Sequence, residues 1–286
     1  MDAEIRREVS RRELSLIRKV PEITLYFWVA KLLTTATGEA ASDYLVYDIN
    51  KYLAVILGFV GLVLALALQL AVRRYVTWLY WFAVTMVAVF GTMAADVLHI
   101  VVGVPYVISS AFFAGTLAVI FVVWFSSERT LSIHSIYSFR RELFYWAAVI
   151  ATFALGTATG DMTAITIGLG YFASILLFAA LIAIPALAYR YLGLNEVIAF
   201  WFAYIVTRPL GASFADWLGR ARSLSGLGFG TGRTALCLSI LIVGIVSYLA
   251  ITRKDVHHDP GSELEGRIGL ASADGSSAGS TPEILE

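Results

Sequence analysis

Eight apolar stretches of about twenty residues follow one another along the chain and constrain its fold more than any other feature. They occupy residues 23–45, 53–72, 76–98, 105–126, 143–164, 170–189, 197–218 and 234–251. An α-helix needs about 20 mainly apolar residues to cross the roughly 30 Å hydrocarbon core of a bilayer. Only 15% of the residues are charged, against about a quarter in soluble domains. The sequence therefore predicts an all-α, polytopic membrane helix bundle with eight transmembrane helices.

The connections between these helices would lie alternately on the two sides of the membrane, and lysine and arginine are much more numerous on one side than on the other. Cytoplasmic loops retain such residues, so the richer side is the inner one. The inner side collects Arg6, Arg7, Arg11, Arg12, Arg18, Lys19, Arg73, Arg74, Arg129, Arg140, Arg141, Arg190, Arg253 and Lys254, and the outer side Lys51, Arg220, Arg222 and Arg233. We therefore expect a multi-pass protein of the cell's inner (plasma) membrane with both termini in the cytoplasm.

The chain ends differ in composition from the apolar region between them. Residues 1–22 are basic and predict a cytoplasmic N-terminal segment, and 23–252 form the membrane domain. Residues 253–286 are rich in Gly, Ser, Asp and Glu, a composition typical of a disordered cytoplasmic tail. The formal net charge of zero gives no indication of a nucleic-acid partner, and the single cysteine excludes a disulfide framework. Lipid is the expected partner, and the sequence leaves the oligomeric state open.

One motif recurs four times without a gap: aromatic, Trp, any residue, Ala, seven residues, Gly, three residues, a small residue, Asp. Its tryptophans are Trp28, Trp81, Trp146 and Trp201. Each motif lies on the first helix of a two-helix unit, and the units cover about 23–72, 76–126, 143–190 and 197–252. Because every unit contains two spans, all four enter the membrane with the same polarity. The sequence thus predicts four parallel repeats around an axis along the membrane normal.

The glycines and tryptophans of the motif have structural interpretations. Gly38, Gly91, Gly156 and Gly211 each belong to a stripe of small residues spaced four apart. Such stripes allow helices to approach closely in a membrane, so these glycines are predicted helix-packing positions. The tryptophans lie near the cytoplasmic helix ends, where we expect them to act as interfacial anchors.

The four aspartates of the motif are the main candidates for function. Asp43, Asp96, Asp161 and Asp216 each follow their tryptophan by fifteen residues, or about 22 Å of helix. That distance places them inside the outer part of the bilayer, where a carboxylate costs at least a few kcal/mol unless it is protonated, paired or hydrated. The sequence therefore predicts a shared site around the axis.

Further polar residues continue the helix face that carries each aspartate. Glu39, Thr34, Thr35, Thr92 and Thr157 are candidate oxygen ligands, and Lys31 and Arg208 are candidate counter-charges. Five acids against two bases would leave unpaired carboxylates for a cation or protons. Oxygen ligands suit Mn²⁺, Mg²⁺ or Ca²⁺, so the four aspartates are a hypothetical metal site.

Two stretches resemble a known family. The first is KVPEITLYFW at residues 19–28, continued by Lys31, Thr34, Thr35, Gly38, Glu39 and Asp43; the second runs from Phe200-Trp201 through Thr207-Arg208-Pro209-Leu210-Gly211 to Asp216. They are similar to a bacterial family of uncharacterised multi-pass "membrane-anchored" proteins, and the resemblance covers about residues 19–254. It implies an inner-membrane location and assigns no site.

These observations favour a transporter or exporter of a small cation, a divalent metal such as Mn²⁺, with proton exchange as one means of coupling. The alternative is a membrane scaffold or assembly subunit in which the buried acids are structural. An enzyme is not expected, because the chain has no nucleophile–base pair, phosphate loop or His-Glu-x-x-His motif. No cofactor is expected apart from a transported ion.

Overall fold

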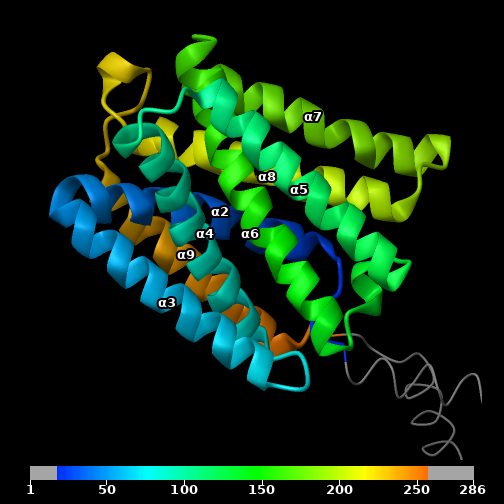
Figure 1. Cartoon of the computed structure of the whole chain (residues 1–286). Helices are drawn as coiled ribbons and strands as arrows, with labels where there is room; N and C mark the ends of the chain where they lie inside the picture. The colour runs from blue at the N-terminus through cyan, green and yellow to red at the C-terminus, as the bar shows by residue number, and fades with distance from the viewer. Residues whose placement is uncertain (1–17, 257–286) are drawn as a thin grey trace, which may run out of the picture.

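A computed structural model describes residues 18–256. In this part of the chain the secondary structure consists of helices joined by loops, without a β-strand (Figure 1). The α-helices are α2 (Leu25–Asp43), α3 (Lys51–Ala71), α4 (Thr77–Asp96), α5 (Tyr106–Glu128), α6 (Phe139–Asp161), α7 (Gly170–Leu192), α8 (Glu196–Gly219) and α9 (Thr231–Thr252). The predicted basic segment up to residue 17 and the predicted tail from residue 257 lie outside the described residues.

Seven helical segments in this range are long and apolar enough to cross a membrane. The first is Leu25–Ala71, in which the π-helical segment Tyr44–Asn50 joins α2 to α3, where the sequence predicts two spans. The backbone at Asn50 is extended, and its Oδ1 accepts hydrogen bonds from the amides of Tyr52 (3.0 Å) and Leu53 (3.1 Å). A side-chain cap of this kind marks the start of a new helix. The chain therefore changes direction between α2 and α3 (Figure 1).

The helices that carry the motif form a closed ring. In this inner ring α2 packs against α4, α4 against α6, α6 against α8, and α8 against α2. The outer helices follow the same rotation: α3 packs on α4, α5 on α6, α7 on α8, and α9 on α2. Figure 1 shows α3 and α7 on opposite sides of the bundle, with inner helices between them. Each unit thus covers the next one, and the fourth covers the first.

Burial separates the two sets of helices as a lipid environment requires. The inner helices α4, α6 and α8 bury most of their residues, whereas α5, α7 and α9 bury a minority. Large apolar side chains such as Phe112, Leu176 and Ile240 are exposed on the outer helices. In a bilayer these side chains contact acyl chains, while the polar residues of the inner ring face protein.

Each motif glycine lies against the next helix of the ring. A Cβ on Gly91 would lie 2.8 Å from the Cβ of Phe153 on α6. Likewise a Cβ on Gly38 would meet Ala88, one on Gly156 would meet Arg208, and one on Gly211 would meet Thr35. All four neighbours stand seven residues after the tryptophan of their own unit, so the same contact occurs at every interface. These close approaches agree with the packing expected of small-residue stripes.

Three of the four motif tryptophans lie in the protein core, contrary to the expectation that they act as interfacial anchors, and Trp28 is partly buried. Trp81, Trp146 and Trp201 are buried in an aromatic core with Phe27 and Tyr145. The Trp201 indole donates a hydrogen bond to the carbonyl of Leu131 at 2.9 Å, in the α5–α6 connection. The reason is the ring itself, because it turns this helix face towards neighbouring helices rather than towards the membrane surface.

We expect Gly38→Ala to lower the stability of the protein by about 1–3 kcal/mol, since the added methyl would overlap Ala88. The measurement is the apparent melting temperature in detergent. Gly115→Ala is the matched control, because nothing lies within 4 Å of a Cβ at that position in α5. Equal melting temperatures for the two variants would contradict the close approach of α2 and α4.

Candidate functional site

Side chains four residues apart on the inner helices form stacked layers around the axis of the ring. Four equivalent residues, one from each unit, make up a layer, and all sixteen are buried. The layers are Lys31, Val84, Val149 and Tyr204; then Thr35, Ala88, Phe153 and Arg208; then the threonine layer of Glu39, Thr92, Thr157 and Ala212; and last the aspartate layer of Asp43, Asp96, Asp161 and Asp216. The spacing of four keeps each column on one helix face.

Arg208 joins all four inner helices at the centre of the ring. From α8, its Nη2 donates to Oε2 of Glu39 on α2 (2.7 Å), to Oγ1 of Thr157 on α6 (2.7 Å) and to Oγ1 of Thr92 on α4. Its Nη1 donates to the carbonyl of Thr35 at 3.3 Å. The guanidinium group therefore contacts the threonine layer in each of the other three units. The sequence predicted Arg208 as a counter-charge, and Glu39 is its carboxylate partner.

Lys31 has a different environment from the one the sequence predicted. Its ammonium nitrogen lies 3.8 Å from the ring centroid of Phe153 and 3.9 Å from that of Tyr204. The side chain is fully buried, and in the described part of the chain its nitrogen has no hydrogen-bond partner. Two aromatic faces, rather than a carboxylate, thus stabilise this charge. Glu39 and Asp43 are about two and three helical turns further along α2, and Lys31 forms no ion pair among the described residues.

In the aspartate layer, Arg220 binds two of the four carboxylates. Its Nη2 lies 2.8 Å from Oδ2 of Asp43, and its Nε lies 3.0 Å from Oδ1 of Asp216. Burial alone would lower the pKa of Arg220, but the carboxylates of Asp216 and Asp43 outweigh it and raise the pKa above its ordinary value. Arg220 therefore stays charged. From the sequence we counted Arg220 only among the basic residues of the outer side; its spacing of four from Asp216 was the signal for its role.

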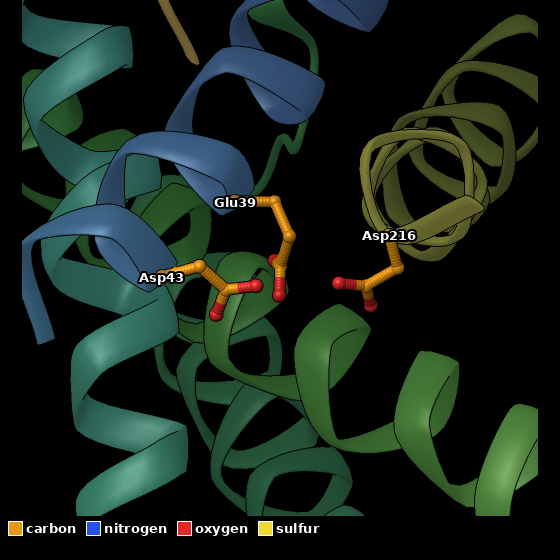
Figure 2. A group of neighbouring side chains, drawn as sticks. All are labelled: Glu39, Asp43 and Asp216. Carbon is orange, nitrogen blue, oxygen red and sulfur yellow. The ribbon is translucent and has the colours of Figure 1, made fainter. Parts of the chain in front are cut away.

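Three carboxylates converge at one edge of this layer. Figure 2 shows Glu39 and Asp43 of α2 and Asp216 of α8 pointing towards one another, and one oxygen from each lies within 4.8 Å of the others. This group has the chemistry of a hard-cation site. Its oxygens already accept from Arg208 and Arg220, so the two guanidinium groups supply positive charge there. A metal ion would have to displace at least one of them.

The other two aspartates line an open cavity. Asp96 and Asp161 are among the residues around a space of about 320 Å³, together with Arg220 and three tyrosines, Tyr47, Tyr106 and Tyr171. No basic group in residues 18–256 forms an ion pair with either aspartate. Oδ2 of Asp96 is buried without a hydrogen-bond partner among these residues.

The charge balance of the site follows from these contacts. Five acids lie in this region, and only two bases, Arg208 and Arg220, form ion pairs with them, since Lys31 pairs with no acid among the described residues. Arg208 pairs with Glu39, and Asp43 and Asp216 share the single charge of Arg220, so Asp96 and Asp161, beside the cavity, are the two acids without an ion pair among the described residues. A cation or bound protons would restore the balance at this point.

The opposite end of the ring is closed by aromatic side chains and by an ion pair. The hydroxyl groups of Tyr80 and Tyr145 share a hydrogen bond of 2.5 Å between α4 and α6. Outside this layer, Lys19 lies 2.5 Å from the carboxylate of Glu142, which also accepts from the Gln69 amide at 3.2 Å. The cavity with the unpaired aspartates thus lies at one end of the polar column, and buried aromatic side chains fill the ring at the tryptophan end.

The predicted threonine ligands divide into two groups. Thr92 and Thr157 lie on the axis and contact Arg208. Thr34 belongs instead to the packing stripe of α2, where its hydroxyl donates to the carbonyl of Lys31 at 2.8 Å. The hydroxyl of Thr35 donates to the carbonyl of Leu32 at 2.7 Å. Neither hydroxyl is directed at a carboxylate of the site.

We expect Arg208→Leu to destabilise the protein by about 3–5 kcal/mol, because Glu39 would be left as a buried charge without its partner. Adding Glu39→Gln to this variant should recover part of the loss, since the amide carries no charge. Thermal unfolding in detergent measures both effects. Arg222→Leu, at an exposed position, is the control and should change little. If Arg208→Leu alone were as stable as the wild type, the guanidinium would not hold the ring together.

Comparison with known proteins gives a family but no function. No curated protein and no solved structure matches the chain. The family described as "Repeat of Unknown Function (DUF347)" matches four segments, residues 26–75, 79–130, 144–193 and 199–255. Each matched segment includes one inner and one outer helix. The four internal repeats expected from the motif are thereby confirmed, and the chain belongs to the DUF347 repeat family.

Proposed function

We propose that this protein transports a small cation across the membrane through the centre of the inner ring. The observation that carries the proposal is the pair Asp96 and Asp161, which form no ion pair within residues 18–256 and line a cavity at the end of a buried polar column. Buried carboxylates of this kind are expensive in a bilayer and are typical of ion pathways and proton relays.

The arrangement suggests how such a protein would work. A cation entering from the aspartate end would meet Asp96 and Asp161 first and then the convergent oxygens of Glu39, Asp43 and Asp216. Arg220 and Arg208 occupy those oxygens now, so they would act as internal cations that the substrate displaces. The aromatic layer of Tyr80 and Tyr145 would have to open for release on the other side. A divalent metal such as Mn²⁺, exchanged for protons, is the inorganic candidate.

We further propose eight membrane crossings, with both termini in the cytoplasm and the aspartate layer towards the outside. The extended backbone and side-chain cap at Asn50 support two crossings within Leu25–Ala71, since 47 residues of helix would be about 70 Å long. The distribution of lysine and arginine supports the orientation. An inner membrane of a bacterium is the compartment that the family resemblance suggests.

A second candidate function is a membrane scaffold or assembly subunit. The contacts of Arg208 with three neighbouring helices favour it, because they serve stability without any ion. The two candidates differ in the role they give to Asp96. Its buried Oδ2 has no hydrogen-bond partner among the described residues, so it does not contribute to stability as a scaffold residue would.

The transport proposal is tested by flux into proteoliposomes that contain the purified protein. We expect Mn²⁺ or proton movement, read by an entrapped dye, to fall at least tenfold in Asp96→Asn and in Asp161→Asn, because each loses a charge in the cavity. Glu196→Gln is the control, since that carboxylate is 62% exposed and far along α8 from the aspartate layer. If the wild type moves no cation and the asparagine variants only melt earlier, the scaffold function is supported instead.

The topology is tested by cysteine labelling, for which the chain offers a simple background. After Cys237→Ser removes the only thiol, Asn50→Cys and Arg73→Cys place one thiol each at the two ends of α3. We expect a membrane-impermeant maleimide to label Asn50→Cys from outside intact cells and Arg73→Cys only after permeabilisation. Labelling of Arg73→Cys from outside would mean that Leu25–Ala71 crosses once.

A further inference from the structure

Three tyrosine rings surround the cavity that contains the unpaired aspartates. Tyr47 comes from the segment after α2, Tyr106 from the start of α5 and Tyr171 from the start of α7. Tyr171 is almost fully buried, whereas Tyr47 is half exposed and stands at the rim. Aromatic faces and carboxylates therefore share one space of about 320 Å³.

The tyrosines are placed to receive positive charge. The Arg220 guanidinium carbon lies 5.2 Å from the ring centroid of Tyr47, so a cation already occupies one aromatic face at this site. Tyr106 is held by stacking on His99, with ring centroids 3.5 Å apart and an interplanar angle of 17°. The charge on Arg220 does not exclude a second cation, because Asp43 and Asp216 bind it directly.

The cavity suits an organic cation better than a bare metal ion. A divalent metal needs six or more oxygen ligands for Ca²⁺, or near-octahedral ligands at about 2.1 Å for Mg²⁺. This space holds roughly ten waters at about 30 Å³ each and offers carboxylates from Asp96 and Asp161 only. Its volume lies at the lower end of the range for small organic ligands, about 300–1,000 Å³. The oxygens that do converge, at Glu39, Asp43 and Asp216, lie beside the guanidinium groups instead.

We propose that the cavity binds a small organic ammonium ion, a methylated or quaternary amine. Its cationic head would contact the faces of Tyr106 and Tyr171 and the carboxylates of Asp96 and Asp161. Aromatic rings attract alkylated ammonium groups through the charge distribution of the ring, and the carboxylates neutralise the charge. This inference rests on the proposed transport function for its biological role, but binding itself can be measured without transport.

The first test is isothermal titration calorimetry on the full-length protein in detergent. Choline chloride is the cationic probe, and 3,3-dimethylbutan-1-ol is the neutral control with the same shape and carbon in place of nitrogen. We expect saturable binding of choline and at least tenfold weaker binding of the alcohol. Equal binding of the two would overturn the proposal, because it would show a merely apolar pocket. Saturable binding of Mn²⁺ without binding of choline would overturn it in favour of a metal site.

Variants of one tyrosine separate the aromatic face from the rest of the side chain. Tyr171→Phe keeps the ring and should bind choline within about twofold of the wild type, whereas Tyr171→Leu should bind about tenfold more weakly. Tyr191→Leu is the matched control on the same helix, since Tyr191 is 74% exposed and outside the cavity. Unchanged affinity in Tyr171→Leu would contradict the aromatic contact. Thermal melting of each variant shows whether a loss of binding reflects unfolding.

The two proposals fail in different ways. Choline binding without flux of choline, Mn²⁺ or protons would remove the transport function and leave a binding site. Cation flux without choline binding would retain transport and remove the organic substrate.

Discussion

The contact between Arg208 and the threonine layer is the interaction on which the rest of the structure depends. A guanidinium group in the middle of a membrane protein is costly unless most of its donors find partners within the bundle. Here Glu39, Thr92 and Thr157, one from each neighbouring unit, accept from Nη2 of Arg208, while its Nε is buried without a partner among the described residues. The four inner helices must therefore be at the right distance and rotation together, and the close approach at the motif glycines makes that distance possible. The hydrogen bonds of Arg208 thus hold the four inner helices together at the level where these helices approach most closely.

The four units differ in sequence, so charges are distributed unequally around the ring and along its axis. Three of the units continue as a π-helical segment directly after their aspartate, whereas α8 continues as α-helix to Gly219 and brings Arg220 back over the layer. Arg220 then pairs with both Asp43 and Asp216, whereas Asp96 and Asp161 line the cavity without an ion pair among the described residues. Lys31, at the other end of the column, has no acid beside it and is held by Phe153 and Tyr204. Negative charge is consequently concentrated at the open end.

Much of this arrangement could be predicted from the sequence, because it depends on spacing. The motif predicted the repeats, the inner position of its helices and the common level of the aspartates, and Arg208 faces Glu39 as the charge count required. Spacing along one helix cannot reveal which neighbour a side chain meets. For that reason the sequence could not show that Trp81, Trp146 and Trp201 lie in the aromatic core, or that the hydroxyl of Thr34 donates to the carbonyl of Lys31. The tyrosines of the cavity follow the helices that carry the aspartates, so only the fold brings them together.

Each unit packs on the next one around the ring, so the four units occupy equivalent positions about one axis. In an assembly of four identical two-helix subunits, symmetry would place the same side chain four times at the position of Arg208. Four guanidinium groups would then meet on the axis, and no glutamate or threonine pattern could serve them all. A single arginine surrounded by Thr35, Ala88 and Phe153 at the equivalent places therefore requires four units that differ in sequence. Joining the repeats in one chain provides such differences at fixed positions around the ring, for the central charge and for the asymmetric cavity alike.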